Sequence, residues 1–289
     1  MSNLSIKGVI AGDDFIVETI LTGLALNEDL SEYWISAQDQ KRCKELKHKY
    51  NINATTDFDF VDKASIIIFA FKFANAKDIL KKLAEKVSED TIIISVVPGI
   101  ATKFINGFFP KNQIVRLTFN PSIISGEGLA AYVANDRATN ETKFIARDML
   151  SSFGKIVEVA DEDEFEKVRR FIFTNSYLSY VIVKSMVEAA QKLGFSHEQA
   201  GVLIDQIIKG ASRTLISFSH AGNEMLKDGL RNTEFTNRAV ELIKDYGIYD
   251  SIERYLSTKE VPLMFEAYDG TSKGGFNMKY NWFEEFTNT

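Results

Sequence analysis

Short apolar runs alternate with amphipathic segments along the first half of the chain. The apolar runs predict strands at residues 6–11, 33–36, 64–71, 92–97, 114–118, 129–133 and 155–159, and the intervening segments predict helices at 14–25, 38–50, 74–87, 101–108 and 141–153. The run at 64–71 is apolar on both faces, as a central parallel strand should be. Because strands that alternate with helices form parallel sheets, the pattern predicts a Rossmann-like α/β domain with a parallel, doubly wound sheet.

The pattern changes after about residue 160. Residues 165–193 form one long helical stretch without Pro or Gly, Gly194 ends it, and Ser196 can cap a next helix at 197–218. Shorter helices are predicted at 224–230, 233–245 and 249–257. We therefore expect a Rossmann-like domain at 1–160, an all-α domain at 161–257 and an extra C-terminal tail at 258–289.

The composition of the chain argues against two classes of binding partner, nucleic acids and membranes. The chain has 289 residues, and 34 Lys and Arg against 40 Asp and Glu give a net charge of −6. This acidity argues against a nucleic-acid partner, which calls for a basic surface. No apolar run is long enough to span a bilayer, the first residues lack a signal pattern, and a single cysteine suits a reducing compartment. We expect a cytoplasmic protein without a membrane partner.

The first strand-to-helix turn is where a doubly wound sheet would hold a dinucleotide. The usual fingerprint there is G-x-G-x-x-G/A, whose glycines let backbone amides approach the pyrophosphate. In residues 8–16, Gly-Val-Ile-Ala-Gly-Asp-Asp-Phe-Ile, Gly12 remains and Asp13 takes the position of the second glycine. A carboxylate about 4 Å from a phosphate costs about 1 kcal/mol in water and about 4 kcal/mol at an effective dielectric constant near 20. The alternative is that Asp13 and Asp14 cap the first helix and satisfy its dipole.

No metal site is expected from the sequence. The three histidines, at positions 48, 197 and 220, are far apart and form no H-x-H or H-E-x-x-H pattern. A nucleophile elbow and a phosphate-binding P-loop are also absent. Pattern alone therefore leads to a Rossmann-like domain with an appended helical domain and an altered glycine motif.

Several segments, taken in order, share the motifs of one enzyme family. Residues 64–72 resemble A-D-V-V-I-L-A-V-K-P, residues 94–100 resemble I-S-I-A-A-G-V, and residues 115–120 with the following Gly-Glu-Gly at 126–128 resemble V-R-x-M-P-N-T-P and G-E-G. Leu-Gly-Phe at 193–195, Lys-Gly-Ala at 209–211 and Leu-Lys-Asp at 226–228 continue the likeness. The chain thus resembles pyrroline-5-carboxylate reductase, nearly colinearly from residue 6 to 257.

The resemblance implies a fold, a reaction and a partner. In this family the Rossmann-like domain holds NADP or NAD, and the C-terminal helices interlock with those of a second subunit. Hydride passes from the nicotinamide to the C=N carbon of a small cyclic imine, which gives proline. The implied partners are a small-molecule substrate and a second copy of the chain, as a homodimer or a higher homo-oligomer.

The resemblance also implies site residues. It places the cofactor against Gly12, Ser36, Asp57, Ala70, Lys72, Val97, Gly99 and Asn120. Lys41 and Arg42 could favour a 2′-phosphate, or they could be solvated surface cations. The S-P-G-G-T-T substrate loop corresponds to residues 232–237, where Thr236 is kept, Asn237 replaces the second threonine, and Glu234 and Phe235 replace the glycines. His220 lies about where the family has a substrate-side glutamate, so the implied catalytic residues are Thr236, Asn237 and His220.

These replacements leave three functions open. The chain could be an ordinary reductase of the family, because the core segments are preserved. It could be a divergent reductase of another imine or ketone, because the substrate loop is rewritten while Lys72, Gly99 and Asn120 are kept. It could also be a catalytically inactive homologue that acts as a dimeric binding or structural protein, which the Ala11/Asp13 phosphate loop favours.

Overall fold

The computed structural model describes residues 6–12, 14–217 and 234–257. Contacts within the chain divide it into two compact units, which separate between Phe173 and Thr174. The sequence pattern places the domain boundary at residue 160, whereas the division between the units falls inside a helix, α6 (Glu162–Lys192). The first turns of α6 therefore belong to the first unit.

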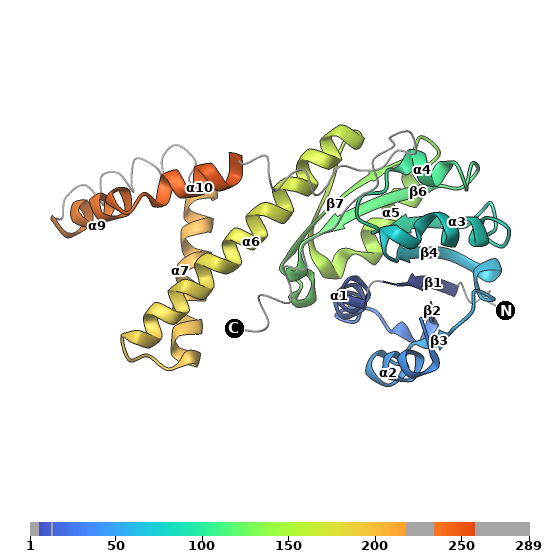
Figure 1. The fold of residues 1–289 in the computed structure, drawn as a ribbon, viewed down its shortest axis with the longest axis horizontal. Coiled ribbons are helices and arrows are strands. Elements are labelled where there is room, and N and C mark those ends of the chain that lie inside the picture. Colours follow the sequence, from blue (N-terminus) through green and yellow to red (C-terminus); the bar gives the residue numbers. More distant parts are fainter. Residues whose placement is uncertain (1–5, 13, 218–233, 258–289) are drawn as a thin grey trace. The chain divides into compact units, whose positions relative to one another are not determined.

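The first unit contains one eight-stranded sheet with helices on both faces (Figure 1). Its strands are β1 (Ile6–Ala11), β2 (Tyr33–Ser36), β3 (Asn53–Thr55), β4 (Ala64–Ala70), β5 (Ile92–Ser95), β6 (Ile114–Phe119), β7 (Gly128–Ala134) and β8 (Gly154–Glu158). They follow the order β3-β2-β1-β4-β5-β6-β7-β8, and the first six have the order of a dinucleotide-binding sheet. The predicted Rossmann-like fold is confirmed.

One pair of strands departs from the parallel arrangement. All neighbouring strands run parallel except β6 and β7, which are antiparallel. The link at residues 120–127 contains only a short 3-10 helix, η4 (Pro121–Ser125). A parallel crossover needs about a dozen or more residues, so this link can only join antiparallel strands.

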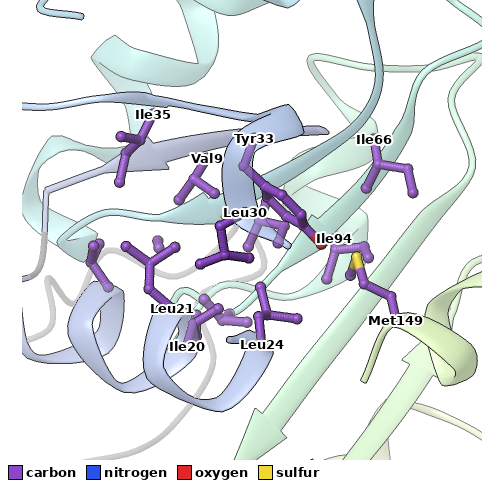
Figure 2. Packing of buried hydrophobic residues seen from close by; sticks show 14 of the residues in the cluster. Val9, Ile20, Leu21, Leu24, Leu30, Tyr33, Ile35, Ile66, Ile94 and Met149 are labelled. Atoms are coloured by element: carbon purple, nitrogen blue, oxygen red, sulfur yellow. The ribbon is translucent and has the colours of Figure 1, made fainter. Parts of the chain in front are cut away.

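The helices of the first unit bury the two faces of the sheet in separate cores. Helices α1 (Asp14–Leu24), α2 (Gln40–Tyr50) and α5 (Asn140–Met149) pack on one face, which Figure 2 shows around Leu21 and Met149. Helices α3 (Ala76–Ala84) and α4 (Thr102–Asn106) pack on the other face. Along β4, Ile66 and Ile68 enter the first core while Ile67 and Phe69 enter the second. This alternation explains why residues 64–71 are apolar on both faces.

A buried network of charged side chains fixes the beginning of α6 to the sheet. Arg116 of β6, whose side chain is 2% exposed, forms ion pairs with Glu162 and Glu166 of α6 and lies over the ring of Phe165. Arg169 pairs with Glu166, and Glu162 accepts hydrogen bonds from the backbone N–H and the hydroxyl of Thr102, at 2.8 and 2.6 Å. The network thus connects β6, α4 and α6 within the first unit.

The described residues of the second unit form helices and short turns. It contains the remainder of α6, α7 (His197–Ser217), α9 (Glu234–Asp245) and α10 (Ile248–Ser257). Gly194, with φ +96°, follows α6, and Ser196 caps α7 by accepting a hydrogen bond of 3.1 Å from the Gln199 N–H. The side chain of Gln199 accepts in return from the Ser196 N–H at 2.9 Å, which completes a capping box.

Two further observations bear on the sequence-based expectations. The predicted helix at 224–230 lies outside the described residues. Among the helices that the structure describes, none combines the length and the apolar character needed to cross a membrane.

Candidate functional site

The residues predicted to contact a cofactor lie along one edge of the sheet. Six neighbouring strands, from β3 across to β6, run parallel, so their carboxyl ends meet at the same edge. The predicted residues are at or just after these strand ends, namely Gly12, Ser36, Asp57, Ala70, Lys72, Val97, Gly99 and Asn120. The order of strands reverses at β1, which lies between β2 and β4, and ligands of open α/β sheets bind at such a point.

Gly12 has a structural reason to be glycine. Residues at the ends of β1 and β4 are paired, Ala11 opposite Ala70. A Cβ added to Gly12 would lie 2.9 Å from the Cβ and 3.2 Å from the Cα of Phe71. The close approach of these two strand ends therefore requires a glycine, whether or not a phosphate binds there.

Three of the predicted cofactor residues are buried at the strand ends. Ala70 and Val97 belong to the two hydrophobic cores, with exposed fractions of 0% and 2%, and Ser36 is also buried. Backbone groups are therefore what Ala70 and Val97 can offer to a ligand. Gly99 follows with φ +78°, a conformation in the left-handed region that favours glycine.

Two other predicted residues use their side chains to shape the edge. The amide oxygen of Asn120 accepts a hydrogen bond of 2.9 Å from the Leu129 N–H, which holds the connection between β6 and β7. The carboxylate of Asp57 accepts from the Asp59 N–H at 3.0 Å and from the Thr55 hydroxyl at 2.9 Å, and these bonds lower its pKa. Lys72 is exposed and precedes the short 3-10 helix η3 (Phe73–Asn75).

A cluster of charges between α1 and α2 was not foreseen from the sequence. The Arg42 guanidinium, 20% exposed, contacts Glu18 at 2.7 Å, Asp14 at 3.2 Å and Glu45 at 3.3 Å. Glu18 also accepts from Lys49 and from the hydroxyl of Tyr50. The interpretation of Arg42 as a solvated surface cation is therefore wrong, while Lys41 is exposed.

A sequence signal for part of this cluster exists. Asp14 and Glu18 are four residues apart, so both carboxylates lie on the same face of α1. Their partner Arg42 comes from another element, 24 positions beyond Glu18. No local pattern indicates which cation meets that acidic face.

Because of this cluster, the folding stability of the first unit should depend on pH. Partial burial opposes the ionisation of Glu18, but hydrogen bonds from Lys49, Tyr50 and Arg42 outweigh burial and lower the pKa of Glu18 below its usual value of 4.5. A carboxylate with a lowered pKa stabilises the folded state above its unfolded pKa and loses that contribution as pH falls through its folded pKa. We expect the stability difference between the wild type and Glu18→Gln to be largest above pH 4.5 and to shrink below it.

Denaturant unfolding of both proteins from about pH 7 to about pH 3 measures this dependence. Glu89→Gln, which removes an exposed carboxylate paired with Lys111, is the matched control and should show a smaller pH-dependent difference. A Glu18→Gln difference that stays constant across this range would contradict the lowered pKa.

The structure describes no side chain of the three predicted catalytic residues. His220 and Asp13 lie outside the described residues. Thr236 and Asn237 are in α9, and their side chains lie outside the description. In the described part of the chain, no group of three or more His, Cys, Asp or Glu side chains is placed to hold a metal ion.

Comparisons with known proteins agree with this fold. Residues 8–99 match the family model described as "NADP oxidoreductase coenzyme F420-dependent". Pyrroline-5-carboxylate reductase of Haemophilus influenzae is 23% identical over 184 residues, which cover 63% of this chain and 68% of that protein. Pyrroline-5-carboxylate reductase 2 of Bacillus subtilis is 24% identical over 198 residues, 68% of this chain and 70% of that protein.

A solved structure gives the same fold over most of the chain. The crystal structure of Plasmodium falciparum pyrroline carboxylate reductase with NADP bound superposes with a TM-score of 0.74 at 17% identity, and the match covers 89% of this chain and 95% of that one. In sequence and in fold, the chain is therefore similar to pyrroline-5-carboxylate reductases.

Proposed function

We propose that the protein is an NAD(P)H-dependent oxidoreductase that reduces the C=N bond of a small cyclic imine, with a substrate that differs from that of its relatives. The observation that carries this proposal is the arrangement of the eight predicted cofactor residues at one carboxyl edge, around the point where the strand order reverses. The rewritten substrate loop at 232–237 supports the altered substrate.

The positions of the residues at this edge are compatible with a bound dinucleotide. Helix α1 begins at the end of β1, so its first backbone N–H groups are available to a pyrophosphate, although Asp14 adds a carboxylate there. The ends of β2 and β3 would hold the ribose through Ser36 and Asp57. The buried turn after β5, with Val97 and Gly99, would lie along the nicotinamide.

The bound cofactor would supply the hydride, and the chain would orient the two reactants. Lys72 is an exposed cation at the same edge and can attract an anionic substrate or a cofactor phosphate. Asn120 holds the turn after β6 in place through its bond to Leu129. Thr236 and Asn237 are proposed to bind the substrate carboxylate, and His220 to exchange a proton with the substrate nitrogen.

The inactive homologue is the second candidate, and the charge cluster favours it. Asp14, Glu18 and Glu45 occupy the guanidinium of Arg42, and Asp13 replaces a phosphate-loop glycine. Under this alternative the chain keeps the family fold as a dimeric binding or structural protein, with weak or no dinucleotide binding.

Titration with NADH and NADPH separates the two candidates. We expect at least one of them to bind with a Kd of about 100 μM or tighter, which at about 1 mM cofactor adds about 1.4 kcal/mol to the free energy of unfolding. Energy transfer from protein to nicotinamide and the thermal midpoint are the two readouts. Asp13→Gly should tighten binding, because it removes a carboxylate from the phosphate loop.

Each outcome of this titration favours a different candidate function. Absence of binding by both the wild type and Asp13→Gly would contradict the reductase and favour the inactive homologue. If a cofactor binds, oxidation of that cofactor by pyrroline carboxylate distinguishes an ordinary reductase from one with another substrate.

We also propose that the helical unit assembles as a homodimer. Large apolar side chains of α6 and α7 are exposed in the single chain, which supports this proposal. They are Tyr180, Val181 and Ile182 of α6 and Val202, Leu203, Ile207 and Ile208 of α7, with exposed fractions from 37% to 67%. A second copy of the chain would cover them.

A further inference from the structure

We propose that Glu18, together with Asp14, makes this protein select a dinucleotide without a 2′-phosphate, so that it prefers NADH to NADPH. This inference rests on the proposed dinucleotide-binding function and names the form of the cofactor. It follows from the contacts of Arg42, which the resemblance left open as a 2′-phosphate ligand or a solvated cation.

The position of Arg42 is that of a residue that reads the ribose. In doubly wound sheets the residues after β2 face the adenosine ribose, where an arginine accommodates a 2′-phosphate and a carboxylate accepts a hydrogen bond from the 2′-hydroxyl. Arg42 lies in the first turn of α2, and its backbone N–H donates to the capping carboxylate of Asp39 at 2.8 Å. It is therefore the arginine best placed, among the described residues near β2, to meet a 2′-phosphate.

The guanidinium of Arg42 is already occupied by carboxylates. Its Nη2, Nε and Nη1 atoms each face a different one, at 2.7 Å from Glu18, 3.2 Å from Asp14 and 3.3 Å from Glu45. The fork geometry that recognises phosphate needs these same nitrogens. A 2′-phosphate would have to displace at least one of the three carboxylates.

The charge of the cluster also opposes a phosphate. Lys49 is the second cation and is bound to Glu18, so two cations face three carboxylates and one negative charge remains. A phosphate monoester carries a charge of about −1.5 to −2 at neutral pH, which this site would repel. A ribose hydroxyl, by contrast, can donate to a carboxylate, and Asp14 is 63% exposed and able to accept.

Removal of one carboxylate without a change of shape tests the inference. Glu18→Gln should raise the affinity for NADPH relative to NADH by about tenfold, since about 1.4 kcal/mol of charge interaction corresponds to a factor of ten. The Kd of each cofactor is measured for wild type and variant by nicotinamide fluorescence, at fixed salt. Glu89→Gln is the matched control, because it removes the same charge from an exposed ion pair with Lys111 and should leave the ratio unchanged.

A double variant assigns the effect to Arg42. If Glu18 acts by occupying Arg42, the gain for NADPH should disappear when Arg42→Gln is combined with Glu18→Gln. Asp14→Asn is the second single variant, and it serves if Glu18→Gln does not fold, because Asp14 is more exposed and contacts the same guanidinium. It should shift the ratio of affinities in the same direction.

The results separate this inference from the proposed function. Wild-type binding of NADH, with an unchanged ratio of affinities in both Glu18→Gln and Asp14→Asn, would overturn the role of the cluster and leave the reductase proposal standing. Tighter wild-type binding of NADPH than of NADH would also overturn it. Failure of every form to bind either cofactor would overturn both.

Discussion

Replacement of Arg116 by methionine is expected to lower the free energy of unfolding of the first unit by about 3–5 kcal/mol. The substitution keeps most of the side-chain volume but removes the cation that pairs with Glu162, and it leaves Glu166 with Arg169 as its partner. Glu166 is largely buried, with its side chain 18% exposed, so water cannot fully replace the lost partner. Urea unfolding at neutral pH measures the loss, together with the slope that reports two-state behaviour.

Two further variants show whether the loss comes from unpaired charge. Lys111→Met breaks an ion pair whose two side chains are 66% and 65% exposed, and should cost about 0–1 kcal/mol. The combination of Arg116→Met with Glu162→Gln should recover part of the loss, because it removes the carboxylate that lost its cation and leaves the Glu166–Arg169 pair intact. If Arg116→Met costs no more than Lys111→Met, the network does not hold α6 to the sheet.

Ile207→Glu is expected to convert the proposed homodimer to a monomer at the same protein concentration. A carboxylate in an apolar interface between copies would lose its hydration without a partner, which costs several kcal/mol of association free energy, about two or more powers of ten in Kd. Because the side chain is 57% exposed in the single chain, the substitution should change the folding free energy of the monomer itself very little. Sedimentation velocity of wild type and variant measures the assembly.

The neighbouring position supplies the control for this prediction. Gln206→Glu adds the same charge at an exposed polar position of α7, so the difference between the two variants measures the loss that comes from replacing the apolar side chain. Ile207 and Leu203 are four residues apart and share one face of α7, so Leu203→Glu should act like Ile207→Glu. A monomeric wild type, or an Ile207→Glu protein that still sediments as a dimer, would contradict the proposed interface.

Local pattern was sufficient for most elements of the fold. The expected strand at 114–118 is β6, and the expected helix at 165–193 is α6 with its start shifted to Glu162. The apolar periodicity did not indicate this start, because the residues just before position 165 are charged. Asp161 and Glu164 form the helix cap instead. The strand β3 was missed, since three residues at the edge of a sheet are too few to show alternation.

The sequence predicted where the candidate site residues lie along the chain, but it did not predict which residues they contact. The strand ends that carry Gly12, Ser36, Lys72 and Asn120 follow from the alternation of elements. That Asn120 binds the Leu129 N–H, and that Gly12 touches Phe71, depends on how the strands pair. Such contacts join residues that are far apart in the sequence, and no local pattern predicts which of them meet.

By itself the sequence determined the order of most strands and helices, the Rossmann-like class, the family resemblance and the presence of Gly12 and Asp13 in the turn after the first strand. These features are local, because hydrophobic period and turn chemistry act over a few residues. Tertiary structure alone decided the pairing of Arg42 with Asp14 and Glu18 and the burial of Arg116 against α6. The physical reason is that charge pairing and burial depend on which distant segments meet, as for Arg116 and Glu162, 46 positions apart.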